Sequence, residues 1–305
     1  MSDIKLFDTD GGNVREIPGT SSALERSLQT LIEHHLPTFL QMRFVASEYS
    51  TGVRHGGRID TLALDENGCP VIIEYKRATN ENVINQGLFY LDWLMDHQAE
   101  FELKVQKELG QEAMDSVDWS QPRLVCIAGG FTKYDEHAVQ QMNRNIELIR
   151  YRRFGDDLIA FELVNAVSSV SHSVDAASKS SGSSSYKSKT ILENLALMDQ
   201  ERTDLYDALR AYVMALGDDV QEKTLKLYIA FKRLSNFVCV SCWPTTKSLT
   251  LWVKVAPDTI ELQEGFTRDV RSIGHYGTGD LEITLRTMSD LERAKPLIDR
   301  SYEGS

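Results

Sequence analysis

The amino-acid sequence predicts two folded domains: an α/β domain built on a mixed sheet, then an α+β domain built on an antiparallel sheet. In residues 1–167, segments with helical spacing of apolar residues alternate with short runs of β-branched residues. Residues 168–189 are rich in serine and poor in large apolar residues, as flexible linkers are. Residues 190–305 carry consecutive β-type runs followed by a final helical pattern.

The composition is that of an ordinary globular protein. The chain has 305 residues, of which 42% are hydrophobic and 26% are charged, and its formal net charge is −12. This negative charge argues against indiscriminate coating of nucleic acid, although it is compatible with a local basic surface. The first residues are polar and acidic, unlike a signal peptide, and no apolar run reaches the ~18 residues of a membrane span. The four cysteines suggest no disulfide framework. We therefore expect a cytoplasmic protein that does not enter a membrane.

The first domain is expected to begin with an amphipathic helix. Apolar residues recur at helical spacing between Leu24 and Leu36, and Ser22 followed by Glu25 forms the pattern of a capping box. A strand at 43–49 and a hairpin at 57–76 come next. The remaining elements of this domain are expected as helices at 80–96, 101–109 and 135–143 and as strands at 123–128, 146–151 and 158–164.

The expected hairpin brings charged residues together. Centring its polar turn near Asn67 places Asp60 opposite Glu74 and Arg58 opposite Lys76. Opposed residues on one face of a strand pair have Cβ atoms roughly 5 Å apart, and residues two apart in a strand share a face. The sequence therefore predicts two carboxylates and an ammonium on one small patch of an otherwise apolar hairpin.

Such a patch is unfavourable in a purely structural sheet. Opposed like charges destabilise a strand pair, and a half-buried pair of carboxylates raises the pKa of one member. A divalent cation removes this conflict, because Mg²⁺ prefers oxygen ligands and is commonly held by one or two carboxylates with phosphate oxygens and water. A neighbouring lysine can orient or deprotonate water and offset phosphate charge. The alternative for Glu74 and Lys76 is ordinary pairing on a solvated strand face.

Four sequence elements together resemble a known family. Gly57-x-x-Asp60 followed by Glu74-Tyr75-Lys76 resembles the core of the PD-(D/E)xK nuclease superfamily. The run from Gln86 to Tyr90 matches the Q-x-x-x-Y signature of its RecB-like branch, and Glu25 resembles the first-helix acid of the NucS-like endonucleases. The resemblance covers roughly residues 23–164 and implies a restriction-endonuclease-like core for the first domain.

The resemblance implies a Mg²⁺ or Mn²⁺ site and gives roles to individual residues. Asp60, Glu74 and the backbone carbonyl of Tyr75 would hold the metal, and Lys76 would position or activate water. Glu25 would support a water ligand or a second metal, with a helix-capping role as the alternative. The residues expected to contact the substrate are Gln86, Tyr90, Arg58 and Arg77. For the first two, a surface amide and a packed ring are the alternative.

The function implied by the resemblance is that of a metal-dependent DNA endonuclease, in DNA repair or anti-phage defence. Two other classes stay open: a nucleic-acid binding module without turnover, and a protein-interaction scaffold. The intact Asp60, Glu74 and Lys76 count against the first, whereas the negative net charge supports the second. Relatives of this type often act as dimers, so a homodimer is a further expectation. The second domain would supply targeting through nucleic acid or a partner protein.

The second domain is expected to be a compact α+β unit. Its elements are expected as a helix at 205–216, strands at 226–232, 237–242, 249–255 and 281–286, and a final helix at 291–302. The segment 274–280, Gly-His-Tyr-Gly-Thr-Gly-Asp, resembles an uncharacterised C-terminal domain often found behind nuclease-like domains. It is interpreted either as a phosphate-binding loop or as a tight turn in which His275 satisfies backbone groups.

Three weaker signals remain. Cys239 and Cys242 lie three apart in an expected strand and therefore face opposite sides, which argues against a zinc site. His55 is close to Asp60 in sequence and is a further candidate for substrate contact. A local basic cluster forms either a phosphate-contacting patch or a solvated strand face; its members are Arg144, Arg150, Arg152 and Arg153.

Overall fold

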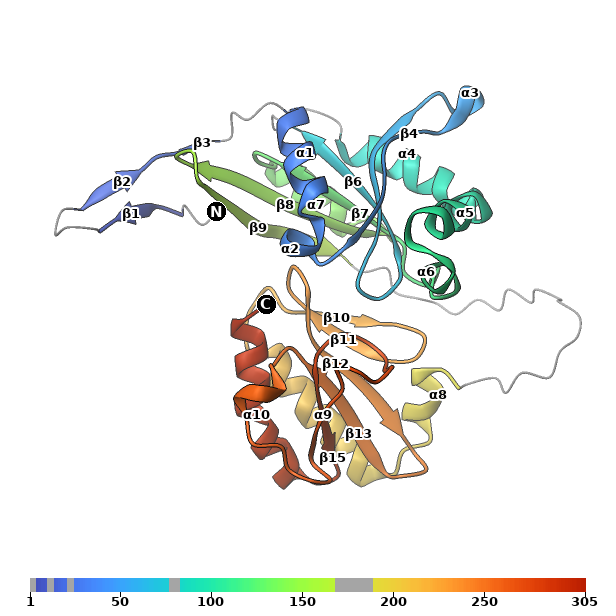
Figure 1. Ribbon diagram of the computed structural model, residues 1–305, viewed down its shortest axis with the longest axis vertical. Helices are drawn as coiled ribbons and strands as arrows, with labels where there is room; N and C mark the ends of the chain where they lie inside the picture. Colours follow the sequence, from blue (N-terminus) through green and yellow to red (C-terminus); the bar gives the residue numbers. More distant parts are fainter. Residues whose placement is uncertain (1–3, 10–13, 21–24, 77–82, 168–188) are drawn as a thin grey trace, which may run out of the picture. The chain divides into compact units, whose positions relative to one another are not determined.

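The computed structural model describes residues 4–9, 14–20, 25–76, 83–167 and 189–305. The chain divides into two compact units, Met1–Ser169 and Val170–Ser305, each with its own sheet (Figure 1). The serine-rich linker expected at 168–189 lies outside the described residues, apart from its last residue. Within the described ranges, no helix is both long enough and apolar enough to cross a membrane.

The N-terminal unit is built on a mixed sheet, as the sequence predicts. Its strands are β3 (Gly19–Thr20), β4 (Arg43–Ser50), β5 (Arg58–Leu64), β6 (Pro70–Lys76), β7 (Arg123–Ala128), β8 (Asn145–Phe154) and β9 (Leu158–Val167). Strands β4, β5 and β6 form an antiparallel meander, whereas β6, β7 and β8 run parallel. Both β3 and β9 pair antiparallel with β8. A separate two-stranded sheet is formed by β1 (Leu6–Asp8) and β2 (Arg15–Ile17).

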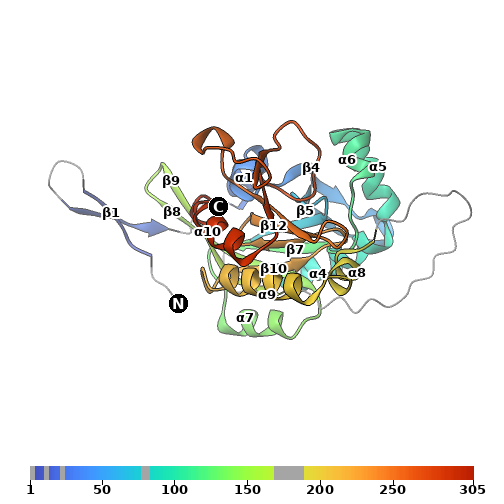
Figure 2. The ribbon, with the colours of Figure 1, turned by 90° about the horizontal axis from the view of Figure 1, so that it is seen from below.

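Helices cover both faces of this seven-stranded sheet. They are α1 (Glu25–His34), α2 (Leu36–Leu40), α3 (Gly52–His55), α4 (Val83–Asp96), α5 (Gln98–Leu109), α6 (Gln111–Asp115) and α7 (Lys133–Gln140). Residues of α4, α5 and α7 form one core cluster with Ile72 and Leu124 of the sheet. Figure 2 shows α1 and α7 on opposite sides of the sheet. Burial on both faces explains why β6 and β7 are almost continuously apolar in sequence.

A glycine sets how closely α4 approaches the sheet. A Cβ atom built on Gly87 would lie 2.4 Å from Leu124 Cδ1, a distance at which one of the two must move. Gly87 therefore allows the α4 backbone to pack directly against β7. This close packing carries Gln86 and Tyr90 towards the start of β5.

The C-terminal unit is built on an antiparallel sheet, again as the sequence predicts. Its elements are α8 (Ile191–Ala196), α9 (Gln200–Met214), β10 (Gln221–Thr224), β11 (Ile229–Lys232), β12 (Asn236–Trp243), β13 (Ser248–Val253), a 3₁₀ turn (Pro257–Thr259), β14 (Thr267–Asp269), β15 (Leu281–Leu285) and α10 (Met288–Glu303). The strand order is β10-β11-β12-β13-β15-β14, with every pairing antiparallel. All three helices contribute to one core cluster on a single face of the sheet. Capping boxes at Thr190 and Thr287 define where α8 and α10 begin.

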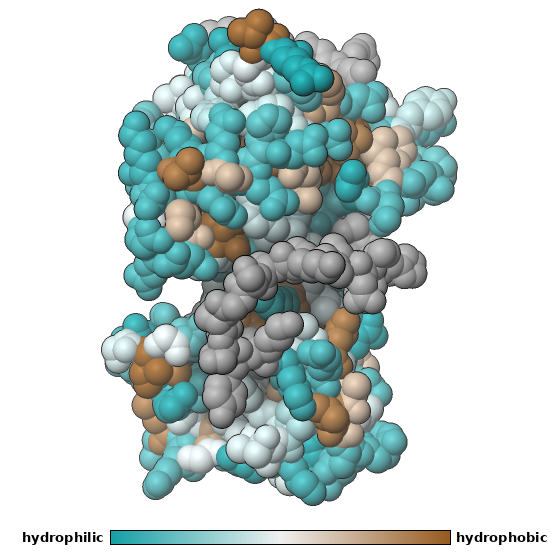
Figure 3. All heavy atoms as spheres, turned by 90° about the vertical axis from the view of Figure 1, so that its right-hand side faces the viewer, coloured by the Kyte–Doolittle hydropathy of each residue, from teal (hydrophilic) through white to brown (hydrophobic). Residues whose placement is uncertain are grey.

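The described surface carries no large apolar face on the side drawn in Figure 3. Hydrophobic residues there form small patches separated by hydrophilic ones. Single exposed apolar residues are normal for globular proteins and indicate no interface by themselves.

A buried ionic cluster holds the end of the N-terminal sheet that is remote from the expected site. Arg123 at the start of β7 lies 2.7 Å from Glu147 Oε1 and 3.5 Å from Asp65 Oδ2, and all three side chains are buried. Burial alone lowers the pKa of Arg123, but the two carboxylates outweigh it and raise that pKa. The guanidinium therefore stays charged and ties the β5–β6 turn to β7 and β8.

Replacing Arg123 with Met is expected to lower the free energy of unfolding of the N-terminal unit by about 3–5 kcal/mol, because two buried carboxylates lose their cation. Urea unfolding followed by tryptophan fluorescence measures this change. The matched control is Arg144→Met, whose exposed side chain lies 4.0 Å from Asp92 and should cost less than about 1 kcal/mol. Equal costs for the two variants would contradict the assigned role of Arg123.

Candidate active site

The β5–β6 hairpin has the register that its turn predicts. Gly68 takes a φ of +76° in the turn, a conformation that favours glycine. Thr61 pairs with Ile73, the register for which Asp60 and Glu74 come next as partners. Regular pairing of the two strands stops at Thr61, so the strands separate where the two acids lie.

At this point, side-chain carboxylates accept the backbone hydrogen bonds between the two strands. The Asp60 N–H donates to Glu74 Oε1 at 3.1 Å, and the Tyr75 N–H donates to Asp60 Oδ2 at 3.0 Å. Each acid is therefore bound to the backbone of the opposite strand. The Tyr75 N–H points to β5, and in a strand the carbonyl of the same residue points to the same side. Two carboxylates and one carbonyl thus converge between the separating strands.

Glu74 is the most unusual group of the site. Its residue is 0% exposed, and Oε2 is buried without a hydrogen-bond partner among the described residues. Burial raises the pKa of Glu74 to about 9, and the Asp60 charge adds to this effect. The Asp60 N–H and the Lys76 ammonium act in the opposite direction, without cancelling it. The neighbour of Glu74 on β7 is Cys126, a buried residue that gives no charge compensation.

Helix α1 supports the site from one face of the sheet. Gln29 donates from Nε2 to the Asp60 carbonyl at 2.9 Å and to Glu33 Oε1 at 3.1 Å. Glu33 Oε1 also accepts a hydrogen bond from Thr61 Oγ1 at 2.5 Å. Sequence reasoning missed these residues; the available signal is that Gln29 and Glu33 follow Glu25 at spacings of four, on one helix face.

Helix α4 supports the start of β5. The Tyr90 hydroxyl accepts from the Arg58 N–H and from Gln86 Nε2, both at 3.2 Å. A Cβ atom on Gly57 would lie 2.4 Å from the Tyr90 ring, so the glycine of Gly57-x-x-Asp60 is required for this contact. Gln86 and Tyr90 therefore hold β5 in place. Their expected contact with a substrate stays a prediction.

The other expected site residues differ in their burial and in their partners, and some lie outside the described residues. Lys76 ends β6 and is half-buried, two residues beyond Glu74. Arg58 is exposed and forms an ion pair with Glu48 at 2.6 Å. Arg77 lies outside the described residues, as does the proposed capping serine of α1. Glu25 is the first residue of α1, and its side chain is outside the described part of the structure.

The donor set fits a small divalent cation. A cation between the carboxylates would partner the buried Glu74 Oε2 and remove the repulsion from Asp60. Two carboxylates, one carbonyl and water are oxygen ligands of the kind that Mg²⁺ prefers. Within the described ranges, no group of three or more His, Cys, Asp or Glu side chains is placed to hold a metal ion. The site would therefore depend on carbonyl and water oxygens in addition to its two acids.

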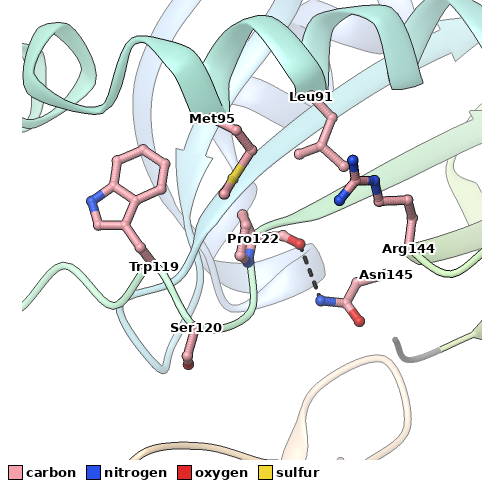
Figure 4. A pocket seen from close by; sticks show the side chains of 7 residues that line it. All are labelled: Leu91, Met95, Trp119, Ser120, Pro122, Arg144 and Asn145. Carbon is pink, nitrogen blue, oxygen red and sulfur yellow. Dashed lines mark hydrogen bonds between the residues drawn. The ribbon is translucent and has the colours of Figure 1, made fainter. Parts of the chain in front are cut away.

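A separate pocket lies at the other end of the parallel strands (Figure 4). Arg144 and Asn145 line it at the start of β8, and Asn145 Nδ2 donates to the Pro122 carbonyl at 3.1 Å just before β7 begins. Leu91 and Met95 of α4 close one side. The pocket contains no carboxylate, and it lies at the opposite strand ends from Glu74, so it is not part of the acidic site.

The basic cluster expected from the sequence is not one exposed patch. Arg150 is buried and paired with Glu162 at 2.9 Å, whereas Arg144 lies at the start of β8 near Asp92. His55, the further candidate for substrate contact, is the last residue of α3 and stacks on Phe89 with ring centroids 3.8 Å apart. Arg150 is therefore no longer a candidate for phosphate contact. His55 lies beside α4.

Comparison with known proteins finds a match to a family model within the C-terminal unit. Residues 196–305 match the family described as "Domain of unknown function (DUF5655)". An uncharacterized protein of Haemophilus influenzae (strain ATCC 51907 / DSM 11121 / KW20 / Rd) is 29% identical over 311 residues, which covers 98% of this chain and 100% of that protein. No solved structure matches the chain. The relative thus spans both units, and the C-terminal domain expected from the sequence corresponds to a family of unknown function.

The raised pKa of Glu74 predicts how stability depends on pH without metal. Its folded pKa of about 9 lies above the ordinary value of 4.5, so the folded protein keeps a proton that the unfolded chain releases. In EDTA, the free energy of unfolding should fall as pH rises from about 4.5 to 9, whereas Glu74→Gln should remove this slope and be the more stable protein at pH 8. Urea unfolding at several pH values measures this dependence. The transition to follow is that of the N-terminal unit, which is identified as the one that Arg123→Met shifts.

The control for this experiment is Glu112→Gln, the same change at an exposed position in α6. It should retain the pH dependence of the wild type. Parallel pH profiles for the wild type and Glu74→Gln would show that Glu74 is ionised at its ordinary pKa.

Proposed function

We propose that the N-terminal unit is a metal-dependent DNA endonuclease that hydrolyses phosphodiester bonds. One observation carries the proposal: Asp60 and Glu74 meet between separating strands, and the buried Glu74 Oε2 has no partner among the described residues. A purely structural hairpin gains nothing from this arrangement, because a buried acid beside a second carboxylate must either carry an unfavourable charge or hold a proton at neutral pH.

The roles of the residues follow from their places. Asp60, Glu74 and the Tyr75 carbonyl would hold Mg²⁺ or Mn²⁺, which when bound supplies the positive charge that activates water and neutralises phosphate oxygens. Lys76 lies on the strand face of Glu74, where its ammonium can orient water and stabilise the charge that grows on the phosphate. Asp60 and Glu74 are held by each other's strand before substrate arrives, so little reorganisation accompanies the reaction.

The architecture supports the same proposal. Strands β5 and β6 and helices α1 and α4 carry the elements that resemble the PD-(D/E)xK superfamily, and a mixed sheet is what its restriction-endonuclease-like core would need. Glu25, Arg58 and Arg77 remain the further residues proposed to act on metal-bound water or on substrate. DNA repair and anti-phage defence both suit such an activity, and a homodimer is compatible with a site formed within one chain.

Cleavage of labelled single-stranded, duplex and branched DNA tests the proposal. Wild-type protein should release products with Mg²⁺ or Mn²⁺ and none with EDTA. Asp60→Asn, Glu74→Gln and Lys76→Met should each lower the rate by roughly 100-fold or more, because each removes a group that stabilises charge in the transition state.

Matched controls separate chemistry from general charge effects. The same three changes can be made at exposed positions of α5 and α6, as Lys107→Met, Glu112→Gln and Asp115→Asn. Each of these variants should cleave DNA as the wild type does. Metal-dependent cleavage that survives Glu74→Gln would contradict the assignment of this site. Metal-independent binding without any product would favour a binding module instead.

A further inference from the structure

The C-terminal sheet has two unlike faces. Alternate residues of the central strands enter the core with α8, α9 and α10, among them Val240, Leu251 and Ile283. The residues between them face the other way and are mostly aromatic, hydroxyl-bearing or charged; they are Cys239, Ser241, Trp243, Ser248, Thr250, Trp252, Glu282 and Thr284, and Arg286 follows directly after β15. No described helix of this unit packs on this second face, which we call the Trp243 face.

A shallow groove runs across the Trp243 face. Trp243, Thr250 and Trp252 line it from β12 and β13, and Arg268 of β14 and Arg286, directly after β15, line it from the opposite side. Besides the carboxylate of Glu282, it combines ring faces, hydroxyl groups and guanidinium groups along one path. Rings, hydroxyl groups and guanidinium groups are three kinds of group that bind bases, sugars and phosphates.

The segment 274–280 lies on this face and completes its aromatic surface. Gly277 and Gly279 have φ of +74° and +137°, and Cβ atoms on them would lie 2.5 Å from Cys239 Cβ and 2.6 Å from the Val253 backbone N. Only glycine allows this close approach. Gly277 and Gly279 thus bring the two aromatic residues of the segment, His275 and Tyr276, onto the sheet.

The aromatic side chains form a fixed platform with exposed rings. Tyr276 stacks on Trp243 at 6.2 Å between centroids and meets Trp252 edge-on at 6.3 Å, and His275 stacks on Trp252 at 5.8 Å. Trp252 is 2% exposed and donates from Nε1 to Glu282, so it anchors the group. Trp243 and Tyr276 remain 37% and 36% exposed. Exposed rings already held in place can stack with a base at little entropic cost.

Cationic groups flank this platform. Arg286 is exposed and donates from Nη1 to the Gly265 carbonyl. Because this acceptor carries no charge, the contact does not neutralise the guanidinium. Arg268 pairs with Glu282, the same carboxylate that holds Trp252. Glu282 thus orients both a ring and a guanidinium along the groove, and Arg286 supplies positive charge for a phosphate.

We propose that the Trp243 face binds single-stranded nucleic acid, with bases stacked on Trp243 and Tyr276 and a phosphate contacted by Arg286. An unpaired strand offers base faces and phosphates together, as this groove requires, whereas a duplex hides its base faces. That the strand is DNA rests on the proposed endonuclease activity of the same chain. Linking the two units would raise the local concentration of substrate at the acidic site.

Fluorescence anisotropy with labelled oligodeoxythymidylate tests this inference. The full chain is used in the Glu74→Gln background with EDTA, so that binding is measured without cleavage. The protein should bind the oligonucleotide, and Trp243→Ala and Arg286→Ala should each weaken binding roughly 10-fold, about 1.4 kcal/mol, as expected for the loss of one stacked base or one phosphate contact. Oligouridylate and a blunt duplex serve as further probes, and the duplex should bind more weakly than the single strand.

Three controls give the outcomes their meaning. Trp243→Phe keeps a ring and should retain most of the affinity. Arg300→Ala removes the same charge from α10, where Arg300 likewise donates to an uncharged acceptor, and Tyr134→Ala removes an exposed ring from α7; neither should change binding. Affinity unchanged by Trp243→Ala and Arg286→Ala, or no binding of any oligonucleotide, would overturn the inference.

This inference and the endonuclease proposal can fail separately. Binding through the Trp243 face with no metal-dependent product from the wild type would keep the inference and reject the enzyme. Metal-dependent cleavage with binding insensitive to Trp243→Ala would do the reverse. Preference for oligouridylate over oligodeoxythymidylate would keep the face as a nucleic-acid site and assign it to RNA.

Discussion

The exchange of hydrogen bonds between β5 and β6 at Asp60 and Glu74 is the constraint on which the N-terminal site depends. Each carboxylate accepts a backbone N–H from the opposite strand, and the ladder of β5 and β6 ends at that point. The exchange keeps two acids together where repulsion and burial would separate them. It also leaves the Tyr75 carbonyl facing the gap. The arrangement is unfavourable without a cation, and a bound cation would relieve it; this expected contrast is the physical basis of the proposed function.

The rest of the N-terminal unit holds this arrangement from both faces of the sheet. Gln29 of α1 binds the Asp60 carbonyl, and Tyr90 of α4 binds the Arg58 N–H, so the irregular part of β5 is supported on each side. Gly87 makes the second contact feasible because it lets α4 approach β7. The buried Arg123 cluster fixes the opposite end of the sheet. An apolar, almost fully paired sheet supplies the stability that the acidic site lacks.

The sequence was most informative where short-range rules decide the structure. The turn near Asn67 specified the register of the hairpin, and through it the meeting of Asp60 with Glu74, because a two-residue period allows few alternatives once one face must be buried. The contacts of Gln29, Glu33 and Thr61 could not be predicted, since they join residues 14 to 31 positions apart by tertiary packing. The burial of Arg150 could not be predicted either, because its partner Glu162 lies on the next strand in a register shifted by a bulge. Likewise, the Gly-rich segment at 274–280 showed its role only once Cys239 and Val253 were seen beneath it.

The two units divide the proposed work into chemistry and recognition. The acidic site offers groups for phosphodiester hydrolysis. The Trp243 face offers rings and guanidinium groups but no described pair of carboxylates like Asp60 and Glu74. A relative of similar length that aligns along both units is consistent with their acting together.

Metal binding tests the central claim most directly, because it needs no knowledge of the substrate. Isothermal titration of the full chain with Mn²⁺ should show a site that requires both acids, present in the wild type and in Glu112→Gln but lost in Asp60→Asn and Glu74→Gln. Binding should also release a proton near pH 7, since the raised pKa keeps Glu74 protonated in the metal-free protein. Mn²⁺ affinity that is unchanged by Glu74→Gln, or no proton release, would contradict the account of this site.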